Sequence, residues 1–297
     1  MPENIAQSLR IHREDRDNFN LAKFPTSCLS GYSDHADYLE KLGALRQILA
    51  ERQERLYASQ ERALLVVLQA MDTAGKDGVI EHVLSGMNPQ GVEVTCFKRP
   101  SETELGHSYL WRHDGALPAR GKIGVWNRSH YEEVGVVRVH PEYLAARGID
   151  PEDATKRFWN QRLDEIKHWE RTQASNGIEI VKIFLHISKA EQAQRLLDRI
   201  EDPKKHWKFR VADLAERERW KEYMHAYGAA IAATSTKFAP WYVVPADDKS
   251  NARLAVAQIL EHHLSDDALD LPKMSAEDLR KLPGIRRELM RELQAHR

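Results

Sequence analysis

A glycine–lysine pair stands where a buried strand is expected to run into a helix. The apolar run at residues 63–68, ALLVVL, is followed by QAMDTAGKDG at 69–78, which holds Gly75, Lys76 and Gly78. Backbone N–H groups converge where a strand meets a helix N-terminus, and the helix dipole favours anions there. The glycines let the backbone approach a phosphate closely, and Lys76 adds a mobile positive charge. The pattern therefore predicts a phosphate-binding loop.

The loop departs from the G-x-x-x-x-G-K-[ST] pattern at two positions. Ala70 stands where the first glycine is expected, and Asp77 stands where a hydroxyl would bind Mg²⁺. A metal needs another ligand, and Asp72 is the candidate, because Mg²⁺ takes one or two carboxylates together with phosphate oxygens. The alternative is an ordinary strand–turn–helix corner. The expected phosphate-binding residues are Thr73, Ala74, Gly75, Lys76, Asp77 and Gly78.

Polar residues also follow the apolar run at 122–126. Asn127 and Arg128 come directly after it, and Glu132 and Glu133 follow in the next turn. Ligands of open parallel sheets bind beyond the carboxyl ends of the strands, so Asn127 and Arg128 are expected to face the loop. A guanidinium suits a transferring phosphoryl group, because it is planar, always charged and bidentate, and the alternative for Arg128 is a salt bridge. One glutamate is expected to reach the metal or the nucleotide, and the other to be solvated.

Arg138 and Asp213 are two further candidates for the nucleotide site. Arg138 lies between apolar residues in the stretch VVRVH, so it is expected either to be paired or to bind an anion. Asp213 stands at an expected helix start, where it either caps the helix or positions a lid lysine or a metal.

Residues 198–210, DRIEDPKKHWKFR, form a strongly basic segment. Pro203 interrupts the helical pattern, so we expect a flap between two helices. In P-loop kinases such a flap closes over the phosphates and excludes water. A lid this basic suits a polyanion longer than a triphosphate; the alternatives are a solvated charged corner and a site for single-stranded nucleic acid. The six basic side chains of the segment are Arg199, Lys204, Lys205, His206, Lys208 and Arg210.

An alternation of apolar runs and helix-like stretches positions these segments. The expected strands are 63–68, 92–97, 122–126, 178–187 and 241–244. The expected helices are 37–58, about 78–87, 101–112, 152–175, 189–201, 212–236 and 250–264. Short continuous apolar runs indicate strands buried on both faces, and their alternation with helices indicates a parallel sheet between two helical layers. The sequence therefore predicts a three-layer α/β/α fold around a five-stranded parallel sheet.

The two ends of the chain differ from this pattern. Residues 1–36 show no period and are expected to form an N-terminal arm over the main domain. The main domain is expected at 37–266, with the lid at about 198–220. Residues 267–297 are expected to form a C-terminal helical appendage; its charged helix at 275–296 could serve an oligomer interface.

The composition argues against several classes of protein. Lys and Arg number 44 and Asp and Glu number 45, so the chain lacks the dominant basic field that bulk nucleic-acid binding needs. The two cysteines, Cys28 and Cys96, match no metal spacing and suit a reducing compartment. No apolar run has the length of a signal peptide or of a membrane span. We expect a cytoplasmic protein with no nucleic-acid and no membrane partner.

With these segments in place, the chain resembles the polyphosphate kinase 2 family. The helix with Asp213, Arg217 and Trp220 matches, and all matches together follow the family's order over about residues 37–264. The other matching stretches are MDTAGKDG at 71–78, VWNRSHYEEVGVVRVHP at 125–141, DPKKHWKF at 202–209 and ATSTKFAPWYVVPADDK at 233–249.

The resemblance implies a P-loop kinase fold with a helical lid. It also implies Mg²⁺-dependent, reversible phosphoryl transfer between inorganic polyphosphate and an adenine nucleotide. Asn127 with Glu132 resembles the subgroup that accepts both AMP and ADP. The family's loop aspartate, loop lysine, strand-end arginine and lid-helix aspartate fall on Asp72, Lys76, Arg128 and Asp213. The resemblance also implies that the lid residues that contact phosphate are Arg199, Lys204, Lys205 and Lys208. The expected catalytic residues are Asp72, Lys76, Arg128 and Glu132.

Two other functions are compatible with these residues. An ATP-dependent nucleoside monophosphate kinase would have a similar loop. A non-catalytic P-loop module would bind nucleotide or polyphosphate and dock a partner through the helix at 275–296. We expect the enzyme, acting as a homo-oligomer, either a dimer or a tetramer.

Overall fold

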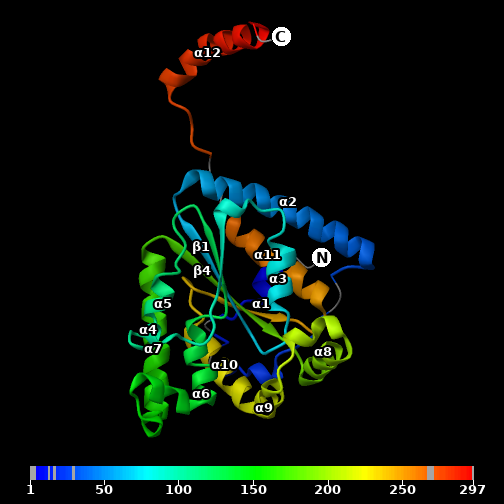
Figure 1. The fold of residues 1–297 in the computed structure, drawn as a ribbon, viewed down its shortest axis with the longest axis vertical. Coiled ribbons are helices and arrows are strands. Elements are labelled where there is room, and N and C mark those ends of the chain that lie inside the picture. The colour runs from blue at the N-terminus through cyan, green and yellow to red at the C-terminus, as the bar shows by residue number, and fades with distance from the viewer. Residues whose placement is uncertain (1–4, 13, 16–17, 29–30, 266–270, 296–297) are drawn as a thin grey trace.

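The structure is a computed structural model of residues 1–297 that describes residues 5–12, 14–15, 18–28, 31–265 and 271–295. Within these residues, five parallel strands form one sheet in the order β2-β3-β1-β4-β5 (Figure 1). The strands are β1 (Ala63–Ala70), β2 (Val92–Cys96), β3 (Ile123–Asn127), β4 (Ile178–His186) and β5 (Trp241–Pro245). The parallel five-stranded sheet predicted from the apolar runs is confirmed.

Strand β1 is the centre of the sheet and is buried along its whole length. It pairs with β3 on one side and with β4 on the other. From β1 the chain passes over β3 to β2, returns to β3, and then crosses β1 to reach β4. The connections therefore diverge at the carboxyl ends of β1 and β3, and ligands of open α/β sheets bind at such a point.

Helices cover both faces of the sheet. One face packs against α2 (His35–Ser59), α3 (Lys76–Val83) and α11 (Lys249–Leu264). The other face packs against α7 (Lys156–Ser175) and α10 (Trp220–Thr234). Even-numbered positions of β1 enter the first core and odd-numbered positions the second, because successive side chains of a strand point to opposite faces. The predicted three-layer α/β/α architecture is therefore confirmed.

The remaining elements are shorter connections and the lid. The other α-helices within the main body are α1 (Ile5–Leu9), α4 (Glu102–Leu105), α5 (Trp111–Asp114), α6 (Val136–Val139), α8 (Lys189–Glu201) and α9 (Ala212–Glu218). The 3-10 helices are η2 (Leu21–Lys23), η3 (Pro89–Gly91), η4 (His130–Glu133), η5 (Pro141–Arg147), η6 (Pro151–Asp153) and η7 (Pro203–Lys208). The basic segment at 198–210 thus comprises the end of α8, the 3-10 helix η7 and the turn that leads to α9.

Two predicted helices are divided in the structure. The helix predicted at 101–112 is the pair α4 and α5, because α4 ends at Gly106. The helix predicted at 212–236 is the pair α9 and α10, separated at Arg219. There the N–H of Arg219 donates to the carbonyl of Glu216 at 3.2 Å, three residues back instead of four, which tightens and ends the first helix.

The N-terminal segment packs on the body. Helix α1 contacts α11 and β5, and the N–H of Ile11 donates to the carbonyl of Trp241 at 2.9 Å. Leu21 is buried in the core that includes α10. These contacts tie the described part of residues 5–28 to the edge strand β5 and to α10.

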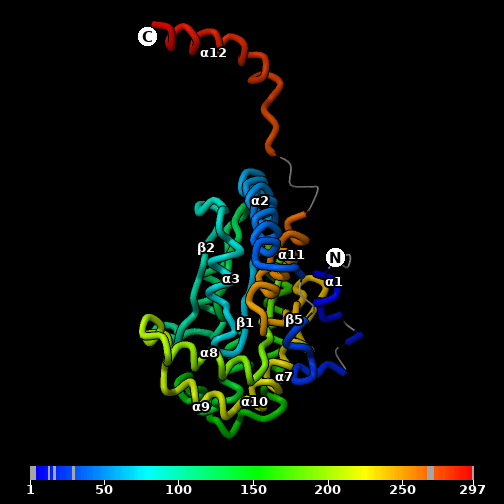
Figure 2. The backbone as a smooth tube through the Cα atoms, turned by 90° about the vertical axis from the view of Figure 1, so that its right-hand side faces the viewer, coloured from blue at the N-terminus to red at the C-terminus, as the bar shows by residue number. Residues whose placement is uncertain are grey.

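The C-terminal helix α12 (Ala276–Ala295) is exposed throughout. Figures 1 and 2 show it projecting away from the rest of the molecule. The predicted boundary between residues 266 and 267 lies outside the described residues, as does His296 at the end of the predicted helix. Within the described ranges, no helix combines the length and apolar character that crossing a membrane requires.

Candidate functional site

The loop after β1 has the backbone that the glycine–lysine pattern predicts. Gly75 has φ +103° and is the N-cap of α3, which begins at Lys76. Thr73 also has a positive φ, +68°, although it carries a side chain. A positive φ at a residue other than glycine costs on the order of 1–2 kcal/mol, so the surrounding contacts must hold it.

Lys76 is a buried cation at the centre of the loop. Its side chain is only 9% exposed, and its Nζ donates to the carbonyl of Ala70 at 3.2 Å. Burial lowers the pKa of Lys76, and the nearby carboxylates of Asp72 and Glu132 partly offset that effect. Among the described contacts only one of its three donors has an acceptor, so Lys76 can still bind an anion.

Arg128 lies opposite the loop, directly after β3. Its backbone has φ +66°, and its N–H donates to the carbonyl of Leu68 at 3.0 Å. Its Nη2 lies 3.1 Å from Oδ1 of Asp72, and its Nη1 lies 4.0 Å from Oε2 of Glu132. The charge of Glu132 raises the pKa of Arg128 against the effect of burial. Its side chain is 45% exposed, so its guanidinium also faces the open side of the site.

The carboxylates of the site differ in their surroundings. Asp72 is 41% exposed, whereas Glu132 on η4 is 19% exposed. Burial raises the pKa of Glu132, and the charges of Arg128 and Lys76 act in the opposite direction. Asp77, in the first turn of α3, accepts a hydrogen bond from Nδ2 of Asn127 at 2.7 Å. Asp72 is therefore more accessible than Glu132, and unlike Asp77 it contacts Arg128 directly.

Thr73, Ala74 and Gly78 complete the predicted loop residues. The Oγ1 of Thr73 is buried and has no hydrogen-bond partner among the described residues, and Ala74 is buried in the core. A side chain at Gly78 would approach the guanidinium of Arg253 to 3.2 Å, so the start of α3 packs closely against α11.

The lid holds basic side chains that are mostly exposed. Arg199 is the most constrained of the four predicted residues: its Nη1 donates to the carbonyl of Lys208 at 3.0 Å and lies 4.0 Å from Oδ2 of Asp213. Lys205 pairs with Asp202 at 3.0 Å. Lys204 is exposed, and the Nζ of Lys208 lies 4.9 Å from the centre of the neighbouring Trp207 ring.

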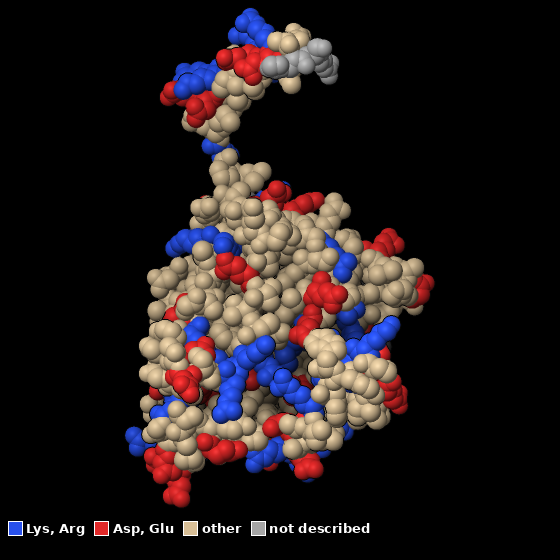
Figure 3. All heavy atoms as spheres, viewed as in Figure 1, with Lys and Arg blue, Asp and Glu red and all other residues tan. Residues whose placement is uncertain are grey.

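Asp213 connects the lid to the loop electrostatically. It lies in the first turn of α9, and its Oδ2 accepts a hydrogen bond from the N–H of Arg210 at 3.4 Å. Burial raises the pKa of Asp213, and the charge of Asp72 raises it further. Figure 3 shows lysine and arginine side chains gathered around the hollow that α8, α9 and α10 border.

Arg138 and Glu133 lie apart from the converging residues. The guanidinium of Arg138 stacks over the ring of Trp159 at 6.0 Å, and among the described residues no hydrogen bond or ion pair joins it to the loop. Its predicted anion-binding role stays a prediction. Glu133 is buried and lies 3.2 Å from Arg147, so the expectation that one of the two glutamates is solvated is wrong. Arg147 compensates the negative charge of Glu133 inside the protein.

Sequence reasoning missed two residues of α8 that contact the loop. The Nε2 of Gln192 donates to the carbonyl of Asp72 at 3.2 Å, and the Nη1 of Arg195 donates to the carbonyl of Thr73 at 3.0 Å. Both side chains are buried. The available signal was their spacing of three residues, which puts two polar side chains on one helical face beside the buried Leu196.

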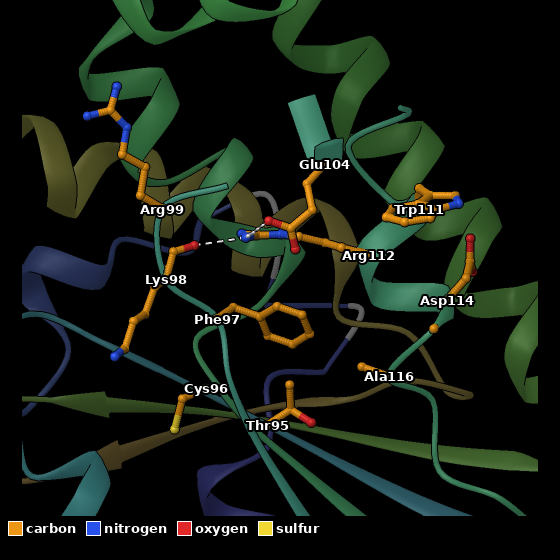
Figure 4. Close-up of a pocket in the computed structure, with 11 residues that line it drawn as sticks. Thr95, Cys96, Phe97, Lys98, Arg99, Glu104, Trp111, Arg112, Asp114 and Ala116 are labelled. Carbon is orange, nitrogen blue, oxygen red and sulfur yellow. Dashed lines mark hydrogen bonds and ion pairs between the residues drawn. The ribbon is translucent and has the colours of Figure 1, made fainter. Parts of the chain in front are cut away.

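A cavity of about 630 Å³ opens beyond β2. Figure 4 shows Phe97, Trp111 and Arg112 around it, with Arg112 reaching the carbonyl of Lys98. Its floor is next to the loop, because Cys96 pairs with Asn127 in the sheet and Asn127 contacts the start of α3. Its volume falls in the range typical of small-molecule pockets, roughly 300–1,000 Å³.

Known proteins that are similar to this chain point to one family. The family model for polyphosphate kinase 2 (PPK2) matches residues 32–272. An ADP-polyphosphate phosphotransferase from Rhodopseudomonas palustris is 46% identical over 273 residues, which cover 92% of this chain and 94% of the relative. An AMP/ADP-polyphosphate phosphotransferase from Meiothermus ruber is 44% identical over 258 residues, covering 86% and 92%.

A solved structure agrees with these relatives. The crystal structure of polyphosphate kinase 2 from Arthrobacter aurescens TC1 is 41% identical, covers 94% of this chain and 95% of its own, and superposes with a TM-score of 0.83. The segment matched by the family model contains the loop after β1, the end of β3 and the lid. The chain therefore belongs to the polyphosphate kinase 2 family.

Proposed function

We propose that the protein transfers a phosphoryl group reversibly, with Mg²⁺, from inorganic polyphosphate to AMP, ADP or both. The observation that carries this proposal is the convergence of Lys76, Arg128 and Asp72 at the N-terminus of α3, with Arg128 3.1 Å from Asp72. Two cations beside a helix N-terminus suit phosphate groups that meet end to end. The family match favours this reading over an ATP-dependent monophosphate kinase and over a non-catalytic module.

The chemistry asks for charge neutralisation and positioning. An oxygen of the acceptor's terminal phosphate attacks the end phosphorus of polyphosphate, the new P–O bond forms, and the P–O bond to the next phosphate breaks. The shortened polyphosphate leaves with the electron pair. Lys76 and Arg128 stabilise the negative charge on the transferring group. A nucleotide phosphate is ionised near neutral pH, so the site needs no strong general base.

The donor groups at the loop fit a magnesium ion that arrives with phosphate. Asp72 supplies one accessible carboxylate, and Mg²⁺ commonly takes one or two carboxylates together with phosphate oxygens and water. The buried Oγ1 of Thr73, which has no described partner, is a further oxygen beside it. When bound, the metal supplies Lewis-acid neutralisation of the phosphate oxygens. Asp72 holds it, and the lid excludes water.

The remaining predicted residues divide between the two substrates. We assign the polyphosphate chain to the basic lid, where Lys204 and Lys208 are exposed. We assign the acceptor nucleotide to Asn127, Arg128 and Glu132, with its nucleoside in the cavity beyond β2 and Asp213 closing over it. The cavity lies at the end of β2 and the loop at the end of β1, with Asn127 at the end of β3 between them, which supports this arrangement.

We also propose that the protein works in the cytoplasm as a homo-oligomer, either a dimer or a tetramer. The exposed helix α12 supports this, because it leaves apolar side chains such as Leu279, Leu289 and Leu293 on the surface. Light scattering coupled to size exclusion measures the mass directly. A monomeric mass at micromolar concentration contradicts the oligomer.

One experiment tests the reaction. Purified protein is mixed with Mg²⁺ and AMP or ADP, and either polyphosphate or a second nucleoside triphosphate is added as donor. We expect ADP and ATP to appear with polyphosphate, measured by chromatography, and the reaction to stop when a chelator removes the metal. Transfer from the nucleoside triphosphate alone would favour the monophosphate kinase. Tight binding without transfer would favour the non-catalytic module.

A further inference from the structure

Two side chains of helix α8 donate hydrogen bonds to backbone carbonyls of the phosphate-binding loop. Gln192 donates to the carbonyl of Asp72 at 3.2 Å, and Arg195 donates to the carbonyl of Thr73 at 3.0 Å. In a trans peptide the N–H points opposite to the C=O. The contact of Gln192 with the carbonyl of Asp72 therefore turns the N–H of Thr73 away from α8. These two side chains set the direction of the loop's peptide groups.

Four of the five N–H donors of Arg195 have acceptors in the described part of the protein. Its Nε pairs with Glu191 at 2.7 Å, and its Nη2 donates to the carbonyls of Ala246 and Asp247 at 2.7 and 3.0 Å. Only 4% of the residue is exposed. Arg195 therefore bridges the end of β5 to the loop. It holds the strained backbone of Thr73 in place.

Gln192 is the only described residue of α8 that joins both the loop and helix α9. Its Oε1 accepts a hydrogen bond from Nη1 of Arg217 at 3.0 Å, while its Nε2 donates to Asp72. The same Nη1 also donates to the carbonyl of Lys189 at 2.6 Å. An amide meets a guanidinium and a carbonyl together in one orientation only, with its oxygen toward Arg217 and its nitrogen toward the loop. The contact is therefore directional.

We propose that Gln192 is a positioning residue, and that the relay Arg217–Gln192–Asp72 makes the phosphate-binding geometry of the loop depend on the position of lid helix α9. The inference rests on the proposed function, because it concerns the same phosphate site. A displacement of α9 removes the donor from Oε1 of Gln192 and frees its amide to rotate away from the loop carbonyl. Closure of the lid restores both contacts and orders the loop.

The test uses three variants of the full-length protein and one matched control. Arg217→Ala breaks the first contact of the relay, Gln192→Ala breaks both, and the double variant measures their coupling. Gln194→Ala is the control, because Gln194 lies on the same helix but is exposed and contacts Asp198. Thermal unfolding by circular dichroism checks that each variant is folded.

We expect each single variant to lower kcat by about tenfold, the loss that goes with one hydrogen bond to a charged or strained group. The double variant should lose no more than the larger single loss, and the control should match the wild type. A fourth variant, Gln192→Glu, keeps an acceptor for Arg217 but loses the donor to Asp72. It should lose as much as Gln192→Ala.

Several outcomes overturn the relay. They are additive losses in the double variant, wild-type turnover in Gln192→Glu, or an equal loss in the Gln194→Ala control. Calorimetric binding of tripolyphosphate gives a readout that does not depend on turnover, and its affinity should fall in the same order. If the wild type binds tripolyphosphate but transfers no phosphate, the proposed function fails, and the affinities still decide the relay. If the wild type does not bind tripolyphosphate, the relay fails as well.

Discussion

Two lysines are buried among the residues that the structure describes, and their surroundings differ. Lys182 on β4 is fully buried and donates to Glu170 at 2.6 Å, to the carbonyl of Thr234 at 2.8 Å and to the hydroxyl of Tyr131 at 2.9 Å. Its three donors have three acceptors. Lys76 in the loop is almost as buried, but it has one described acceptor, the carbonyl of Ala70. The Lys182 cluster is therefore complete, because every donor of its ammonium group has an acceptor within the protein. The Lys76 cluster is incomplete, because two of its three donors have no described acceptor.

The difference separates a structural cluster from the proposed phosphate site. Burial alone would raise the pKa of Glu170, but the charge of Lys182 lowers it below its usual value, so this carboxylate stays charged beside the lysine. Burial lowers the pKa of Lys76 because its partners do not compensate it fully. A buried charge without enough partners is costly, and under the proposed function a phosphate supplies the missing acceptors of Lys76.

The largest effect is expected at the complete cluster. Lys182→Met should lower the free energy of unfolding by about 3–5 kcal/mol, because it leaves the charge of Glu170 buried without its partner. Chemical denaturation measures this loss. The double variant Lys182→Met with Glu170→Leu should regain much of the stability, since neither charge remains. A single variant as stable as the wild type would show that the pair does not hold the core.

At the incomplete Lys76 cluster we expect substitutions to lower turnover and to leave stability nearly unchanged. Lys76→Ala and Arg128→Ala should each lower turnover by about 10² or more, the usual cost of one preorganised donor in a transition state. The melting temperature should change little, because the two side chains make few contacts that a ligand-free protein needs. Steady-state kinetics and circular dichroism check both statements. Turnover like that of the wild type in a folded variant contradicts the assignment.

A third buried group avoids the cost of a charge by staying neutral. His113 is 1% exposed, and burial lowers its pKa to about 2. Below pH 6.5 the unfolded chain takes up a proton at this residue and the folded protein does not, so stability is lost as the pH falls. Between pH 7 and pH 5 the loss should be about 2 kcal/mol.

The variant His113→Phe isolates this contribution. Its free energy of unfolding should fall less steeply between pH 7 and pH 5 than that of the wild type. Urea denaturation at both pH values measures the two slopes. An unchanged slope would show that His113 does not stay neutral in the folded protein.

The smallest effects are expected at the exposed lid cations. Substituting Lys204, Lys205 or Lys208 by Ala should lower kcat/KM by up to about fivefold each, because exposed charges contribute roughly 0.2–1 kcal/mol. The loss should be larger with long polyphosphate than with tripolyphosphate, since only a long chain reaches the lid. Assays at several chain lengths measure this. Equal losses at every length would count against the lid as a polyphosphate track.

Much of the fold follows from local patterns in the sequence. All five strands were predicted at their places, and the continuous apolar run of β1 is buried on both faces as expected. The expectation of burial is wrong for β2, which is largely exposed because it is an edge strand. The helix predicted at 189–201 coincides with α8. Each of the helices predicted at 101–112 and 212–236 is a pair of shorter helices in the structure. Apolar periodicity alone does not reveal the turn at Gly106 or the tightened turn at Arg219.

The candidate site likewise contains residues that the sequence revealed and residues that it did not. The loop with Gly75 and Lys76, and Arg128 at the end of β3, were evident from residue types and their place after apolar runs. The roles of Gln192 and Arg195 were not evident, because α8 lies about 120 positions along the chain from the loop it contacts. Lys182 gave no signal either, because a lysine inside an apolar strand does not reveal its partners.

By itself the sequence determined which segments become strands, where the chain turns, and which side chains are available at the strand ends, because these depend on residues close together along the chain. Only the tertiary structure decided which buried charges are fully paired and which remain partly open. That depends on strand order and helix packing, which bring Arg128 to Asp72 across 56 positions and Lys182 to Thr234 across 52. A buried charge is compensated by its neighbours in space, and local patterning does not specify them.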